Sequence, residues 1–372
     1  MAMSYRQSRN PEVTCLNHRS VPKILVLATS YAPELRRTAR RPKEYPRTDY
    51  VELAKLLDCD ILDYSIYDDS PRVLWAYRGF EKRLRLDLHL ALSGFQRAKD
   101  YDVVMLMSER VAIPYMMLQK VLGRRCATVL VSAHSSEKQA KLVRALNLFE
   151  GLDIVVSNTH AQRRFLTDRM LIPENRIRYV LYAVDEQFFV PGAGGDYVLS
   201  AGGVAGRDYP TLFKAVRDLP IEVKITATGR LYGPDARRAL HPIPPNVELM
   251  PPTDSAGMRE RYQHAVVVVV PLHEGRQDAA GCSVVLEAMC CGRPVIATRT
   301  PGMEDYIRDD HTGRLVDPSD SEALMKTLVF LEDQRDAGEQ WGVNARLECE
   351  TRLSLSNLAH GLKAAALGAY GH

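Results

Sequence analysis

The chain has 372 residues, of which 46% are hydrophobic and 26% are charged, and its formal net charge is +3. This length suits two domains of about 150 to 200 residues. The small net charge argues against a nucleic-acid partner, which would need a concentrated basic stripe. No apolar run approaches the ~18 residues of a membrane helix. Residues 1–15 lack the apolar core of a secretory signal, so we expect a cytoplasmic protein.

The first half alternates short β-rich runs with helical patterns, which is typical of parallel α/β sheets. Strands are expected at residues 23–29, 60–65, 102–108, 127–133, 153–157 and 177–183, and helices at 49–57, 72–99 and 160–170. A polar stretch with glycine and proline, residues 184–196, then predicts a link between two domains.

The second half restarts the same alternation. Strands are expected at residues 196–202, 221–229, 246–250, 265–271 and 293–298, and helices at 210–219, 283–291, 321–334, 339–348 and 354–367. We therefore predict an α/β protein with two doubly wound Rossmann-like domains and a cleft between them. Its parts are a loose lead-in (1–20), an N-terminal domain (21–190), a C-terminal domain (191–350) and a final helix (351–372) that can pack back on the N-terminal domain.

The seven cysteines are scattered and show no metal-ligand spacing, so we predict reduced thiols and no metal site. Cys290 and Cys291 follow Ala288 and Met289 in a helical pattern, which favours a structural role over a redox one.

The segment with the clearest chemistry is residues 271–307, where a central strand is followed by a loop and a helix. Backbone N–H groups near Gly281, Cys282 and Ser283, together with the helix dipole, can bind a diphosphate. Glycine lets phosphate oxygens approach the backbone closely. Glu287, one turn further on, can accept hydrogen bonds from a ribose diol. The plainer interpretation is an ordinary strand–loop–helix unit with a solvated Glu287.

The run LEAMCCGRPVIAT at 286–298, continued by HTGRLVDPSD at 311–320, resembles glycosyltransferase family 4. Residues 183–191 resemble the family's interdomain segment, and residues 200–216 resemble the first strand and helix of its donor domain. The resemblance covers nearly the whole chain and is weakest before residue 127. It implies a GT-B fold and a retaining hexosyltransferase that uses a UDP- or GDP-sugar donor. It also implies no cofactor and no obligatory metal ion, with the donor in the C-terminal domain and the acceptor in the N-terminal domain.

The resemblance also implies roles for single residues. Arg207 matches a basic side chain that contacts the donor diphosphate, for which a forked guanidinium is well suited; the alternative is a surface residue at a helix start. Arg230 matches more loosely as a second positive contact. His134, at the predicted end of a strand, matches a histidine beside the transferred sugar.

One position departs from the family pattern. The family usually carries a glutamate eight residues before the position of Glu287, and here that position is Ala279. Asp278 and Glu274, in the same loop, are the candidates to replace the missing acid near the sugar. The departure keeps a catalytically inactive nucleotide-sugar binder open as an alternative, and a nucleotide-sugar epimerase of the same architecture is another. A nicotinamide oxidoreductase is disfavoured, because SYAPELRR at 30–37 replaces the GxGxxG fingerprint.

Two basic segments leave the acceptor side undecided. Residues 72–99 mix aromatic residues and leucines with seven basic residues. This pattern fits a peripheral contact with the inner face of a membrane, or a helix that packs its leucines inward. A basic cluster within residues 36–43 can face an acidic acceptor or be solvated. The acceptor itself, whether a glycan, a lipid or a small molecule, is not disclosed by the sequence.

Overall fold

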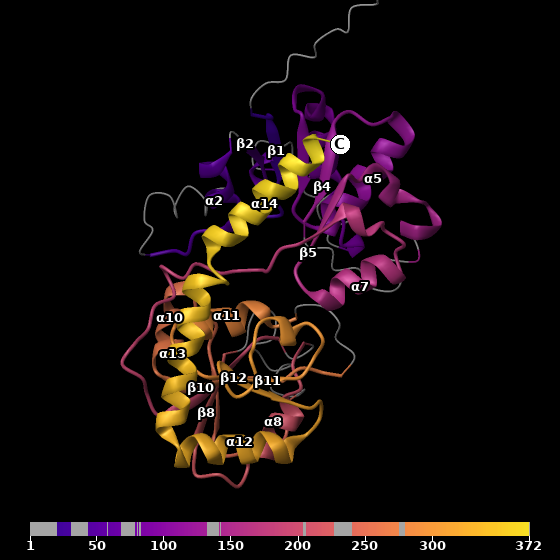
Figure 1. Ribbon diagram of the computed structural model, residues 1–372. Helices are drawn as coiled ribbons and strands as arrows, with labels where there is room; N and C mark the ends of the chain where they lie inside the picture. Colours follow the sequence, from indigo (N-terminus) through magenta and orange to yellow (C-terminus); the bar gives the residue numbers. More distant parts are fainter. Residues whose placement is uncertain are drawn as a thin grey trace, which may run out of the picture.

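The computed structural model describes residues 21–30, 44–57, 59–67, 79, 81, 83–131, 141, 143–203, 206–226, 240–274 and 280–371. Over these ranges the chain forms two six-stranded parallel sheets, each with helices on both faces (Figure 1). The predicted fold class is therefore confirmed. None of the helices within the described ranges has the length and apolarity needed to cross a bilayer.

The N-terminal sheet has the order β2-β1-β3-β4-β5-β6. One face is covered by α4 and α5, and the other by α2 together with α14 (Leu355–Tyr370) from the far end of the chain. The strands are β1 (Ile24–Leu27), β2 (Cys59–Leu62), β3 (Val103–Leu106), β4 (Ala127–Leu130), β5 (Ile154–Ser157) and β6 (Ile177–Tyr179), and the helices are α2 (Asp49–Leu56), α4 (Leu88–Arg97), α5 (Glu109–Leu122) and α7 (His160–Asp168).

The C-terminal sheet has the order β12-β11-β10-β7-β8-β9. One face packs against α8 and α12, the other against α10, α11 and α13. The strands are β7 (Tyr197–Ala201), β8 (Glu222–Thr226), β9 (Val247–Met250), β10 (Ala265–Val270), β11 (Val295–Thr298) and β12 (Gly313–Val316), and the helices are α8 (Tyr209–Val216), α10 (Ser255–Gln263), α11 (Cys282–Cys290), α12 (Ser321–Asp333) and α13 (Arg335–Thr351). The all-valine part of β10 is buried on both faces, as expected of a central parallel strand.

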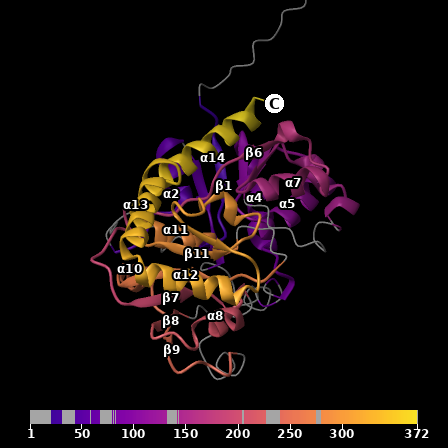
Figure 2. The same ribbon diagram turned by 60° about the horizontal axis from the view of Figure 1, so that its bottom comes forward.

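The chain crosses between the domains twice, and the two crossings touch. The first follows β6, and the second lies between α13 and α14, which lead from one domain onto the other in both views (Figures 1 and 2). Val184 of the first crossing forms a β-bridge with Ser354 of the second. The Glu186 carboxylate accepts the backbone N–H of Leu355 at 3.0 Å. The two crossings are thus held together by backbone and side-chain bonds.

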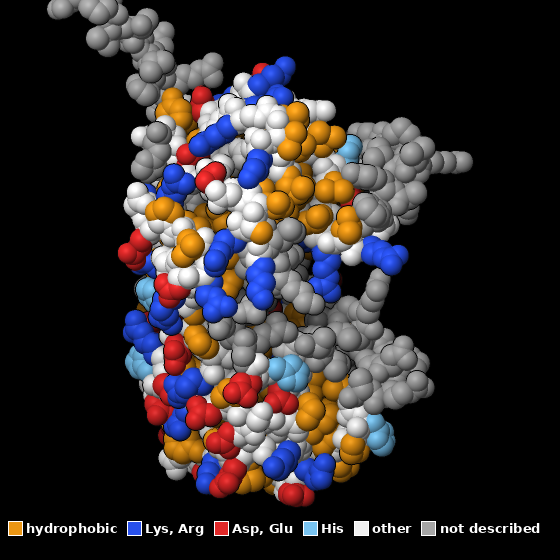
Figure 3. All heavy atoms as spheres, turned by 90° about the vertical axis from the view of Figure 1, so that its right-hand side faces the viewer, with side chains coloured by type: hydrophobic (Ala, Val, Ile, Leu, Met, Phe, Trp, Pro, Cys, Tyr) orange, Lys and Arg blue, Asp and Glu red, His pale blue; other side chains and the backbone are white. Residues whose placement is uncertain are grey.

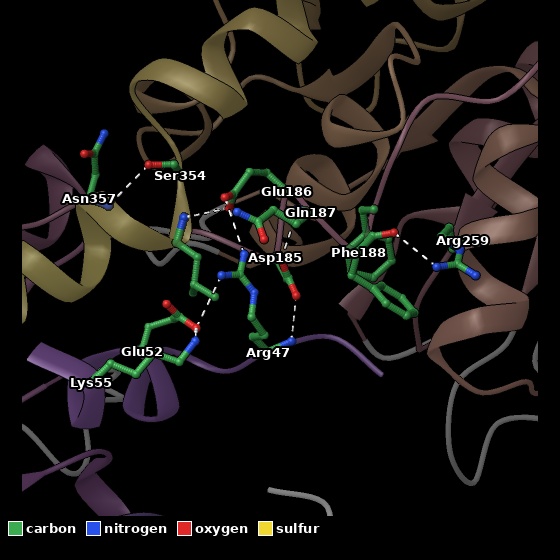
Figure 4. Close-up of polar contacts among 12 residues, drawn as sticks. Arg47, Glu52, Lys55, Asp185, Glu186, Gln187, Phe188, Arg259, Ser354 and Asn357 are labelled. Carbon is green, nitrogen blue, oxygen red and sulfur yellow. Dashed lines mark hydrogen bonds and ion pairs between the residues drawn. The ribbon is translucent and has the colours of Figure 1, made fainter. Parts of the chain in front are cut away.

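An arginine from the N-terminal domain fixes the first crossing (Figure 4). The Arg47 backbone N–H and guanidinium both donate to the Asp185 carboxylate, at 2.7 and 2.6 Å. The same guanidinium lies 3.3 Å from a Glu52 oxygen. From the other domain, Arg346 donates to the carbonyl oxygens of Glu186 and Phe189, each at 2.9 Å. Both domains therefore bind this short segment directly.

The domains also meet where the loop after β11 reaches the start of α7. The Asp305 carboxylate accepts the His160 backbone N–H at 2.8 Å and the Tyr179 hydroxyl at 3.0 Å. The Tyr306 hydroxyl donates to the Asn158 carbonyl oxygen at 2.8 Å. An acidic side chain from one domain thus occupies the positive end of a helix in the other.

The structure differs from the elements predicted from the sequence in two respects. The continuous helix expected over 72–99 is wrong, because Arg85 has a φ of +56° and the chain is not helical again until Leu88. We did not anticipate α5, α10 or β12. The sequence does not predict α5 because a proline lies inside it, and it does not predict α10 because that helix is only weakly amphipathic. The four-residue β12 is too short to show a period.

Candidate functional site

The candidate site lies at the switch point of the C-terminal sheet. Starting at the centre of the sheet, β7, β8 and β9 follow one another toward one edge, and β10, β11 and β12 follow one another toward the other edge. The central strands β7 and β10 are therefore neighbours, and the loops that follow them lead away from each other. Ligands of doubly wound sheets bind beyond the carboxyl ends of such a strand pair. The loops at this point carry Arg207, after β7, and Gly281, after β10.

Arg207 is buried between these two loops and is only 7% exposed, so the alternative of a surface residue is wrong. Its guanidinium donates to the Ala201 carbonyl oxygen at 2.9 Å and to that of Gly206 at 3.4 Å. A Cβ on Gly202, whose φ is +127°, would stand 2.7 Å from the guanidinium carbon. A Cβ on Gly281 would stand 3.4 Å from its Nη2 atom. The turn at Gly202 therefore leaves room for the guanidinium only as glycine, and the turn at Gly281 lies in contact with it.

The helix that follows Gly281 starts without a side-chain cap. Gly281, with a φ of +85°, is the N-cap of α11, whereas α8 and α12 begin at Asp208 and Asp320, whose carboxylates accept first-turn N–H groups. The Cys282 thiol is buried, and burial raises its pKa well above the usual value. Ser283 is exposed. The start of α11 therefore combines the positive end of a helix with a nearby buried cation.

Glu287 lies one turn further along α11, on the same side as Ser283, and is partly buried. Its Oε2 accepts the Tyr262 hydroxyl at 2.8 Å. Burial raises the pKa of Glu287 to about 7, and the hydrogen bond from Tyr262 acts in the opposite direction. Glu287 is thus not the solvated helix residue of the plainer interpretation. A group with this pKa changes its charge near neutral pH.

Three further residues belong to this neighbourhood and were not anticipated. Tyr262, at the end of α10, is fully buried, and burial raises its pKa while Arg207 opposes the shift. Tyr182 lies between the domains. Its pKa is raised mainly by burial, next by the charge of Asp49, and to a smaller extent by the charge of Glu287. Burial raises the pKa of Asp49 itself to about 6. No sequence signal marks these residues, because their roles depend on which elements meet.

The remaining predicted residues are distributed as follows. Glu274 lies just beyond β10 and is exposed. His134, Arg230 and Asp278, as well as Ala279, lie outside the described residues. The structure therefore brings together Arg207, the Gly281–Ser283 turn and Glu287, and their roles stay predictions. Within the described ranges, no three His, Cys, Asp or Glu side chains gather in a way that could hold a metal ion.

Residues 205–348, which include this turn and helix, match the family model described as glycosyl transferases group 1. The C-terminal domain is thus similar to the glycosyl transferases of group 1 over these residues. Curated relatives include the D-inositol 3-phosphate glycosyltransferases of Acidothermus cellulolyticus and Xylanimonas cellulosilytica, each 26% identical. The two matches cover 62% and 64% of this chain and 56% and 63% of those proteins. The chain thus spans less than two thirds of the length of these relatives.

Solved structures show the same fold over nearly the whole chain. Sucrose-phosphate synthase from Thermosynechococcus elongatus has a TM-score of 0.69 at 16% identity, covering 92% of this chain and 97% of that one. A glycosyltransferase from Rickettsia africae has a TM-score of 0.67 at 14% identity, with coverages of 94% and 99%. HepE from Anabaena, in complex with UDP-glucose, has a TM-score of 0.64 at 14% identity, with coverages of 92% and 99%. The GT-B architecture and the resemblance to family 4 are confirmed.

Proposed function

We propose that this protein is a retaining glycosyltransferase that moves a hexose-type sugar from a UDP- or GDP-sugar to an acceptor hydroxyl, without a cofactor or an obligatory metal ion. One observation carries the proposal. At the switch point of the C-terminal sheet, a buried arginine, an uncapped glycine turn and a partly buried glutamate follow one another within the region that is similar to the glycosyl transferases of group 1. This order fits the diphosphate and ribose of a nucleotide sugar.

The chemistry of transfer needs a stabilised leaving group. The bond between the anomeric carbon and the phosphate oxygen breaks, and its electron pair leaves with the nucleoside diphosphate. The acceptor oxygen forms the new bond to the same carbon, and the proton of its hydroxyl passes to a phosphate oxygen of the departing nucleoside diphosphate. Negative charge thus develops on the diphosphate, where the Arg207 guanidinium and the N–H groups of the Gly281–Ser283 turn supply fixed positive potential. Glu287 binds the ribose.

The residues near the sugar follow from the same assignment. Asp278 or Glu274 takes the place of the acid missing at Ala279, and His134 lies beside the transferred sugar. Arg230 adds a second positive contact to the diphosphate. The support is the family pattern together with the position of Glu274 just beyond the central strand.

A two-stage experiment tests the proposal. Thermal-shift measurements with nucleoside diphosphates and their sugars first identify the donor, because a ligand that binds only the folded state raises the melting temperature. Transfer is then assayed with that donor and an acceptor panel of glycans, lipids and small polyols. The names of the curated relatives make an inositol phosphate the first acceptor to try. Absence of any shift with all nucleotides would refute a nucleotide-sugar enzyme.

The two alternatives give different results in the same assay. A nucleotide-sugar epimerase converts the donor to a stereoisomer without acceptor, which chromatography of the sugar product detects. An inactive binder shows a thermal shift but neither conversion nor transfer. The departure at Ala279 motivates this second alternative. A transferase differs from both, because it moves the sugar to a suitable acceptor and releases nucleoside diphosphate as it does so.

The contact with a membrane stays a prediction. In the described part of residues 72–99, α4 buries Leu90, Ala91 and Phe95, which favours the packed-helix interpretation there. Hydrophobic side chains nevertheless gather on the N-terminal domain among Lys and Arg side chains (Figure 3). Val121 and Leu122, at the end of α5, are 80% and 59% exposed. Flotation with anionic and neutral vesicles tests the contact, and equal recovery with both would refute an electrostatic one.

A further inference from the structure

The Glu287 carboxylate, which the proposed function assigns to ribose, has a fixed partner on a neighbouring helix. The Tyr262 hydroxyl donates to Glu287 Oε2 at 2.8 Å. Tyr262 lies in the last turn of α10, and Glu287 lies in the middle of α11. A phenol hydroxyl donates a single hydrogen bond, so it occupies one carboxylate oxygen and leaves Oε1 free of this partner.

Tyr262 is held rigidly by its surroundings. Its side chain is fully buried, and its ring packs edge-on against Phe189 of the first interdomain crossing, with the ring centroids 6.3 Å apart. Phe189 is held in turn, because Arg346 donates to its carbonyl oxygen at 2.9 Å. A fully buried ring cannot change rotamer without displacing the side chains packed around it. The hydroxyl is therefore a donor in a fixed position, and it limits the orientations open to the carboxylate that it binds.

We infer that Tyr262 is a positioning residue for donor binding, which orients the Glu287 carboxylate toward the ribose diol. The inference rests on the proposed function, because it requires that Glu287 contact the ribose. Tyr262 does not touch the ligand in this arrangement. It acts through Glu287, much as hydrogen-bonded outer partners orient the ligands of a metal.

The pairing has a consequence for pH. Burial raises the pKa of Glu287 to about 7, while the Tyr262 hydrogen bond favours the charged form. Among the described residues, the charge of Glu287 also raises the pKa of Tyr182, between the domains, and that of Cys291, after α11. Arg207 acts on the Tyr262 hydroxyl. A diol donates to an ionised carboxylate, so donor affinity contributed by Glu287 is present above about pH 7 and declines as the pH falls through that value. Loss of the tyrosine hydroxyl moves this decline to higher pH.

The experiment compares three variants with the wild type. Tyr262→Phe removes the hydroxyl and keeps the ring, and Glu287→Gln removes the charge. Tyr197→Phe is the matched control, because the Tyr197 hydroxyl donates to the carbonyl oxygen of Arg261, also on α10, at 2.8 Å, away from Glu287. Affinity for UDP and GDP is measured by titration calorimetry from pH 6 to 8.5. Since the terminal phosphate titrates near pH 6, Glu287→Gln supplies the pH baseline without the carboxylate.

We expect Tyr262→Phe to weaken nucleoside-diphosphate binding at pH 7 by about three- to tenfold, less than the loss of a direct charged contact. The midpoint of its pH dependence, relative to the Glu287→Gln baseline, should lie higher than in the wild type. In transfer assays the donor KM should rise while kcat stays nearly constant. Tyr197→Phe should match the wild type in all three respects, and circular dichroism confirms that each variant is folded.

The outcomes separate the inference from the proposed function. If Glu287→Gln weakens binding but Tyr262→Phe leaves both affinity and pH midpoint unchanged, the positioning role is overturned and the ribose contact stands. If Glu287→Gln has no effect, the ribose contact itself is overturned, and the role of Tyr262 with it. If the wild type binds neither UDP nor GDP, nor any of their sugars, the proposed function itself is overturned.

Discussion

Replacing Arg207 by alanine tests the diphosphate site most directly. In the folded protein the guanidinium is almost completely buried, and it donates to the carbonyl oxygens of Ala201 and Gly206. Alanine removes both bonds and the positive charge under the Gly281 turn. The variant should therefore lose stability as well as affinity, so the two effects must be measured separately.

The structure sets the size of each effect. Two hydrogen bonds, each worth about 0.5–1.5 kcal/mol net, give an expected stability loss of about 1–3 kcal/mol. A charge-assisted contact to a diphosphate is worth about 1.5–3 kcal/mol, which corresponds to an affinity loss of about 10- to 150-fold. Because part of the guanidinium is already engaged by carbonyl oxygens, we expect the lower half of that range.

Titration calorimetry with the nucleoside diphosphate and urea unfolding measure the two quantities. Arg293→Ala is the control, because the Arg293 guanidinium is also partly buried and donates to the carbonyl oxygens of Gly192 and Ala265, at the opposite end of the sheet. It should lose stability with no change in affinity. Should Arg207→Ala bind as tightly as the wild type while its stability falls, the arginine is structural, and the assignment of the diphosphate to this turn fails.

Three further predictions concern the glycine turn, the first interdomain crossing and the loop before α11. Gly281→Ala should lower both the melting temperature and nucleotide affinity, since φ is +85° there and the new Cβ would stand 2.9 Å from a Val270 methyl carbon; an unchanged thermal-shift profile would contradict this. Arg47→Ala should cost about 3 kcal/mol in urea unfolding, because it leaves the buried Asp185 carboxylate without its cation, and a loss below 1 kcal/mol would show that the pair is dispensable. Asp278→Asn should lower transfer with nearly intact nucleoside-diphosphate binding, and Glu274→Gln should have the smaller effect; equal, wild-type rates in both variants would exclude a sugar contact from this loop.

The sequence predicted those parts of the fold that depend on local pattern. Strands such as β10 and β11 are continuous apolar runs, and helices such as α12 and α14 have clear amphipathic faces and side-chain caps. Their period and composition are visible within one segment. The break at Arg85 is different, because a positive φ at a non-glycine residue is uncommon and the residue type there does not predict it.

The candidate site shows the same division. The glycine turn and Glu287 lie in one continuous stretch whose chemistry can be read from residue types. Tyr262 lies 25 residues earlier on a helix that the pattern did not reveal, and it reaches Glu287 only because α10 and α11 are neighbours on one face of the sheet. The burial of Arg207 likewise depends on two loops that meet at the end of different strands. Such facts arise from tertiary contact and have no local signature.

The position of α14 bears on how the protein is made by the ribosome. This helix follows the whole C-terminal domain in the chain, yet it covers one face of the N-terminal sheet. During synthesis the strands β1 to β6 emerge first, and the face that carries Ile24, Val103 and Ile154 lacks part of its apolar cover until residues 355–370 have emerged. The nascent N-terminal domain therefore exposes part of this apolar surface until α14 has been synthesised, and chaperones commonly bind such surfaces. The half of the molecule that is synthesised first is the one completed last.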